Sequence, residues 1–171
     1  ATGTVKQIVY GERRRLHEVI IVPEKQDDFL QSEPLLATDV VEIPKEDLVD
    51  RLKKGGLWQG LRQFPALDTA DPGHTPAMII VSMNGNDVFS PHPARVLENN
   101  SEAFETGMAL VRRFSHRIVV TARQSSLDGI RRLDNVLAEQ VTHITDDLYP
   151  AWHPGAVLYQ LKHTQAENAS W

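Results

Sequence analysis

The chain has 171 residues and contains no cysteine, and this absence excludes several kinds of protein. Without thiols it can form no disulfide, no thiolate zinc site, no cysteine-ligated iron–sulfur cluster and no thiol nucleophile. Long apolar runs are also missing, because none approaches the roughly 20 residues that a membrane-spanning helix needs. We therefore expect no direct membrane span in this sequence.

Positive charge is scarce as well. Lys and Arg number 18 against 23 Asp and Glu, the formal net charge is -5, and the densest basic run covers residues 13–15. A nucleic-acid-binding surface usually shows as a basic patch or stripe. The charge balance therefore disfavours a nucleic-acid partner.

The glycine-rich loops that cradle phosphates are absent: the sequence contains neither GxGxxG nor GxxxxGK[ST]. Its seven histidines include no pair at positions i and i+4 of an expected helix. No serine stands in a nucleophile-elbow motif. We therefore predict no catalytic residue and no metal ligand in this chain.

What is present is typical of a globular domain, with 41% hydrophobic and 24% charged residues. Residues 4–10 and 16–22 are predicted strands, and we expect them to belong to a larger sheet because a lone hairpin is marginally stable in water. Residues 25–44 are predicted to be an acidic, proline-containing connector with one short strand at 40–43. We expect domain boundaries at 1–24, 25–44 and 45–165, with a polar tail at 166–171. The sequence begins at Ala1 without methionine and ends in polar sequence, so we expect a fragment of a longer protein.

The most distinctive stretch is residues 47–65. It begins as an amphipathic helix that Gly55 and Gly56 end, and a second short apolar helical turn follows. This corner has two interpretations. It is either the wall of a pocket or interface, or a plain helical hairpin whose aromatic residues are core and whose Arg62 pairs with an acid such as Asp68. On the first interpretation, the candidate ligand-contacting residues are Leu57, Trp58, Arg62, Phe64 and Pro65.

The second half of the chain predicts an α/β domain with a Rossmann-like parallel sheet and flanking helices. Strands are expected at 77–83, 117–122 and 141–145, and helices at 102–114, 127–137 and 156–162. The first strand is predicted to be buried on both faces, because residues 77–81 are continuously apolar. Ligands bind beyond the carboxyl ends of such strands, so the turn after it is a candidate ligand loop. Its residues are Asn84, Gly85 and Asn86.

Four stretches, in order along the whole chain, resemble one family. They are residues 2–22; the Gly56-Leu57-Trp58 corner through Phe64-Pro65; the strand at 77–83 with the helix start Asn100-Ser101-Glu102-Ala103-Phe104; and His153-Pro154-Gly155. Together they are similar to the NqrA family, a subunit of the sodium-translocating NADH:quinone oxidoreductase. That family opens with a lipoyl-like barrel-sandwich, so the resemblance implies that residues 1–24 are the C-terminal half of one.

The resemblance implies a peripheral subunit on the cytoplasmic side of the bacterial inner membrane. The whole complex passes electrons from NADH to ubiquinone and expels sodium, and its NADH and flavin sites would lie outside this chain. The chain itself would hold no redox centre and would dock on other subunits, chiefly a membrane subunit. Ubiquinone is a candidate ligand, because Trp58 with Arg62 would offer a flat apolar surface and a donor to a carbonyl.

A related protein, the electron-input subunit of the Rnf complex, suggests an alternative: a module that binds FMN and NADH. Such relatives use a glycine-rich loop and acidic residues after the strand. Here those places hold residues 60–63 and 84–87, which lack the phosphate-binding glycines. In two places the chain also departs from the NqrA pattern: residues 90–93 replace a shorter loop, and His153-Pro154 lacks a later Gly-Thr-His.

Overall fold

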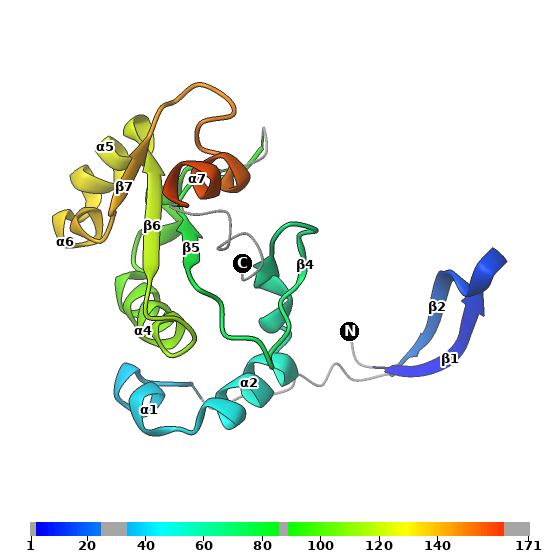
Figure 1. Ribbon diagram of the computed structural model, residues 1–171. Helices are drawn as coiled ribbons and strands as arrows, with labels where there is room; N and C mark the ends of the chain where they lie inside the picture. Colours follow the sequence, from blue (N-terminus) through cyan, green and yellow to red (C-terminus); the bar gives the residue numbers. More distant parts are fainter. Residues whose placement is uncertain (1–2, 25–33, 86–88, 163–171) are drawn as a thin grey trace. The chain divides into compact units, whose positions relative to one another are not determined.

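The computed structural model describes residues 3–24, 34–85 and 89–162. The chain divides into two compact units, Ala1–Pro34 and Leu35–Trp171 (Figure 1). Residues 35–44, which the sequence analysis assigned to the connector, lie in the second unit. The expected tail at 166–171 lies outside the described residues.

The first unit is an antiparallel hairpin of β1 (Gly3–Tyr10) and β2 (Leu16–Pro23), as the sequence predicted. A single 3₁₀ turn, η1 (Glu12–Arg14), joins the strands, and the amide of Gly11 donates to the carbonyl of Arg15 at 2.8 Å to close the loop. Nearly every side chain of both strands is exposed, including the large apolar ones. In the described part of the chain these strands pair only with each other, so the larger sheet stays a prediction.

The second unit is built on a parallel sheet in the order β5-β6-β7, formed by Ile79–Ser82, Ile118–Arg123 and His143–Thr145. This confirms the predicted α/β class and the parallel pairing. Helices α3 (Pro93–Leu97) and α4 (Ser101–Arg112) connect the first two strands, and α5 (Gln124–Leu133) and α6 (Asn135–Glu139) connect the last two. The final helix, α7 (Pro154–Leu161), begins slightly before the expected range of 156–162, and Pro154 occupies its first turn.

One face of this sheet packs on α4, α5 and α6. Its core includes Val120, Leu127 and Ile130, all almost fully buried. In β6, residues 119–122 are buried and Ile118 is half-buried, whereas β5 is half-buried throughout. The expectation that β5 is buried on both faces was therefore wrong. β5 is an edge strand of the described sheet, and its other face lines a cavity.

A second core joins α1 (Ala37–Glu42), α2 (Lys45–Lys54) and the end of α4. α1 corrects the short strand expected at 40–43. Val40 is fully buried in this core, and the Arg113 guanidinium donates hydrogen bonds to the carbonyl oxygens of Val41 and Ile43, the latter at 3.1 Å. Packing on α4 thus overrides the β preference of the branched side chains, as tertiary contacts often do.

The helix expected at 127–137 is two helices. Asp134 leaves helical geometry between α5 and α6, and its carboxylate accepts from the amides of Val136 (2.8 Å) and Leu137 (3.3 Å). An aspartate in this role caps a new helix rather than continuing the old one. The other expected helices and strands of this unit occur within a few residues of their predicted positions.

Candidate functional site

The second unit contains a cavity with a volume of about 680 Å³. This lies within the range of small-molecule pockets, which are mostly apolar with a few polar groups. Its walls come from the corner that follows α2, from residues 70–78, from the open face of β5, and from the start of α7. The lining residues include Leu61, Arg62, Phe64, Ile80, His153 and Leu158.

The corner turns sharply where α2 ends. Gly56 has a φ of +72°, a conformation that favours glycine, and the amide of Leu57 bonds back to the carbonyl of Leu52 at 2.9 Å. The expected second helical turn is only the 3₁₀ turn η2 (Trp58–Gly60). The chain then forms a small antiparallel pair, β3 (Arg62–Gln63) with β4 (Asp68–Thr69), which the sequence analysis missed. Arg62 and Phe64 therefore project from a strand and its turn, not from a helix.

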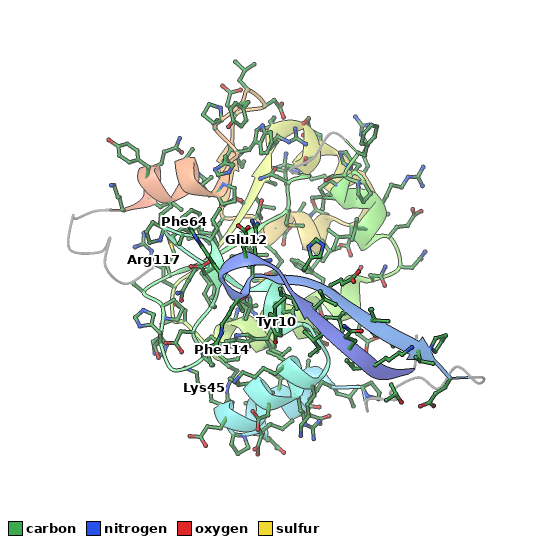
Figure 2. The ribbon with its side chains drawn as sticks, turned by 90° about the vertical axis from the view of Figure 1, so that its right-hand side faces the viewer. Tyr10, Glu12, Lys45, Phe64, Phe114 and Arg117 are labelled. Atoms are coloured by element: carbon green, nitrogen blue, oxygen red, sulfur yellow. The ribbon has the colours of Figure 1, made fainter. Side chains whose placement is uncertain are left out.

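Trp58 forms part of both the core and the pocket wall. It is 6% exposed, its indole N–H donates to the carbonyl of Ala70 at 2.8 Å, and its ring meets Phe114 edge-to-face with centroids 5.5 Å apart. The ammonium group of Lys45 lies 5.5 Å from the centre of the Phe114 ring (Figure 2). Because its donor is already used, Trp58 can offer a ligand only its apolar surface.

The other predicted corner residues separate into two groups. Arg62 and Phe64 line the pocket, with Arg62 exposed and Phe64 half-buried. Leu57 and Pro65 are exposed and are not among the lining residues. The ion pairs found among the described residues do not include the alternative pair of Arg62 with Asp68.

The strand-end loop predicted to hold a ligand makes contacts within the fold. The Asn84 side-chain oxygen accepts from the amide of Arg123 at 2.7 Å, which ties the end of β5 to the end of β6. A Cβ on Gly85 would come within 2.8 Å of the Ser90 side chain, so this backbone approaches its neighbour closely. Neither residue lines the cavity, and Asn86 lies outside the described residues.

At the same edge of the sheet, a carboxylate of the chain itself is bonded to the start of α5. The hydroxyl of Ser125 donates to Asp147 at 2.5 Å, and the Ser125 amide, in the first turn of α5, donates to the same oxygen at 3.4 Å. Helix N-termini attract anions, and this one already has one. Nearby, the Arg123 guanidinium lies 5.1 Å from the centre of the Trp152 ring.

The sequence analysis did not propose the pocket residues of α7. His153 is the N-cap of this helix: its Nδ1 accepts from the amide of Gly155 at 3.2 Å. His74, from the irregular segment after β4, also lines the cavity. The signal in the sequence was the His-Pro pair at a helix start, which indicates a cap but does not indicate which cavity the ring faces.

The described ranges contain no group of three or more His, Cys, Asp or Glu side chains placed to hold a metal ion. In the same ranges, none of the helices has both the length and the apolar character to cross a membrane.

The comparisons with known proteins agree with one another. A family model described as the NqrA second alpha/beta domain matches residues 43–171. The NqrA subunit of the Na(+)-translocating NADH-quinone reductase of Cellvibrio japonicus is 25% identical over 172 residues, covering 100% of this chain and 37% of that protein. Its namesake from Pseudomonas aeruginosa strain UCBPP-PA14 is 28% identical over 99% of this chain, again covering 37% of the relative. The Serratia proteamaculans protein of the same name is 30% identical over 67% of this chain and 26% of its own length. The matches thus cover 26–37% of the length of these relatives.

Proposed function

Because this chain belongs to the NqrA family, we propose that it is part of the NqrA subunit of a Na+-translocating NADH:quinone oxidoreductase. In this proposal the whole complex passes electrons from NADH to ubiquinone and moves sodium. The chain serves as a peripheral piece on the cytoplasmic side of the bacterial inner membrane and docks on other subunits, chiefly a membrane subunit. It carries no redox centre of its own; NADH and flavins bind elsewhere in the complex.

We further propose that the 680 Å³ pocket receives the quinone head group, and the pocket is the observation that carries this proposal. A quinone head is flat, uncharged and largely apolar, with two carbonyl oxygens that accept hydrogen bonds. Phe64, Ile80 and Leu158 supply apolar walls, and the exposed Arg62 supplies a cation at the rim. Such a lining, apolar with a few polar groups, is what ligand pockets of this size usually show.

The hairpin of the first unit fits a lipoyl-like barrel-sandwich in this proposal. Its strands carry large exposed apolar side chains such as Val5, Ile21 and Val22, and a two-stranded ribbon cannot cover them alone. Strands from elsewhere in the longer protein would complete the layer.

Binding of FMN and NADH, the alternative, is supported by no feature of the described residues. The carboxyl edge of the sheet would have to admit a phosphate. There, Asp147 already occupies the start of α5, and Asn84 ties the two strand ends together. Flavin released on denaturation of the purified chain would favour this alternative over the quinone proposal.

The test uses the assembled complex with Phe64→Ala and Arg62→Ala. We expect the KM for a soluble ubiquinone to rise about tenfold for Phe64→Ala, since an aromatic wall contributes on the order of 1–2 kcal/mol to a ligand. NADH oxidation by ferricyanide, which bypasses the quinone, should be unchanged in both variants. Matched controls are Phe89→Ala and Arg51→Ala, both exposed and outside the cavity lining. Unaltered quinone affinity in both test variants would show that the corner is only a scaffold.

A further inference from the structure

His153 stands at the start of α7, where the backbone amides of the first turn lack helical partners. Its Nδ1 accepts from the Gly155 amide at 3.2 Å. Pro154 follows His153 and has no amide hydrogen that needs an acceptor. The cap fixes the orientation of the imidazole ring relative to the helix. The ring is therefore held by the backbone before any ligand arrives.

The cap also determines which ring nitrogen carries the proton. In a neutral imidazole one nitrogen donates and the other accepts. Since Nδ1 accepts from Gly155, the proton of the neutral ring is on Nε2. None of the hydrogen bonds found among residues 34–85 and 89–162 uses Nε2 of His153. This nitrogen is also not one of the buried polar atoms without a hydrogen-bond partner in those residues. Nε2–H is thus an accessible donor on a residue that lines the cavity.

The ring lies next to the aromatic wall of the corner. A Cβ built on Gly155 would be 3.3 Å from His153 Nδ1 and 3.5 Å from Phe64 Cε1, so the two rings approach the same point. Phe64 and α7 come from distant parts of the sequence, and α7 also lies beside β5 (Figure 1). Residues of both elements line the cavity. A flat molecule lying on Phe64 would therefore have the imidazole within reach of its edge.

A second histidine in the chain makes the same cap without a pocket. His92 Nδ1 accepts from the amide of Ala94 at 3.2 Å, and Pro93 follows it. The His92 ring packs against Gly129, where an added Cβ would come within 2.4 Å of the ring, and it does not line the cavity. The His-Pro cap is therefore a feature of the helix start and does not depend on a neighbouring cavity. What distinguishes His153 is the cavity that its Nε2 can reach.

We propose that the Nε2–H of His153 donates a hydrogen bond to a carbonyl oxygen of a neutral, planar, quinone-type ligand that lies on Phe64. This inference rests on the proposed function and names the group that recognises the ligand. A neutral donor among apolar walls suits an uncharged carbonyl compound, because a charged ligand would lose its hydration there. Arg62, exposed on β3, remains at the rim.

The test is His153→Asn in the assembled complex, with His92→Asn as the matched control. Asparagine is a good N-cap, so both variants keep the helix start while the imidazole donor is removed. For His153→Asn we expect the KM for ubiquinone-1 to rise about tenfold, the usual size of one lost hydrogen bond to a ligand. His92→Asn should leave the KM unchanged. Ferricyanide-coupled NADH oxidation should be unchanged in both variants, and the Tm of the complex reports assembly. If His153→Asn does not assemble, His153→Ser, which also keeps a cap, decides the question.

A second probe separates the donor from the pocket. A dimethoxybenzene analogue of ubiquinone-1, without carbonyl acceptors, should inhibit the parent complex and the His153→Asn complex equally. If His153→Asn leaves the KM unchanged while Phe64→Ala raises it, the pocket binds quinone and the assignment of His153 is wrong. If neither variant changes the KM, the proposed function itself fails.

Discussion

The hairpin and the α/β unit contain strands of similar apolar character but bury them very differently. Ile21 of β2 is 51% exposed, whereas Val120 of β6 is 2% exposed. β6 has a strand on each side and helices over one face, while β1 and β2 have only each other among the described residues. Apolar composition alone therefore does not make a core; a second layer has to cover it.

The strongest test of this comparison is to remove the same side chain from each region. Ile130→Ala removes a fully buried side chain from the α/β core, and we expect the free energy of unfolding to fall by about 2–5 kcal/mol through lost transfer energy and a cavity. Ile21→Ala in the hairpin should change it by no more than about 0.5 kcal/mol. Chemical denaturation followed by circular dichroism measures both. Equal losses would show that the hairpin has a core of its own.

A smaller effect is expected from Arg113, which ties α4 to α1. Arg113→Ala removes the donors to the carbonyls of Val41 and Ile43, and a hydrogen bond to a charged group is worth about 1.5–3 kcal/mol. Hydrogen exchange should show loss of protection confined to α1. Arg112→Ala is the control, since the hydrogen bond of that exposed neighbour among the described residues goes to the Gln140 side chain at 3.4 Å and not to α1. Undiminished protection in the Arg113 variant would mean that α1 does not depend on this tie.

The cap between α5 and α6 should matter less again. Asp134→Ala deletes the acceptor for the amides of Val136 and Leu137, at an expected cost of about 0.5–2 kcal/mol. Asp134→Asn keeps an acceptor oxygen and should recover most of the loss. Thermal melts of the parent chain and the two variants would rank their stabilities. An asparagine variant as unstable as the alanine variant would contradict the capping role.

The smallest effect is expected from removing residues 1–34 altogether. Because residues 35–171 are a compact unit with their own cores, we expect the shortened chain to unfold cooperatively, within about 0.5 kcal/mol of the parent. Calorimetry would measure this directly. A broad, non-cooperative melt would show that the two regions are not the independent units that the comparison assumes.

Some of the site was predictable from local sequence, and some was not. Trp58, Arg62 and Phe64 were chosen because the corner combines aromatics and one cation, and all three line the cavity. His153 was noticed only as part of the His-Pro-Gly stretch that resembles the NqrA family, not as a residue of the site. The turn at Asn84 and Gly85 looked like a ligand loop because of its place after a strand, yet its contacts are internal. The position of a loop after a strand of a parallel sheet thus indicated a candidate ligand site, but it did not indicate that the side chains there would bond to the protein itself.

The sequence by itself determined the features that depend on neighbouring residues. The apolar period of α2, its end at Gly55-Gly56, the helix start at Asn100 and the parallel strands were all readable, because periodicity, caps and breakers act within a few residues. Only the tertiary structure decided that residues 37–42 form a helix and that Phe64 meets Gly155 beside the His153 ring. Those outcomes depend on the shapes of segments far apart in the chain, and such complementarity leaves no local pattern in the sequence.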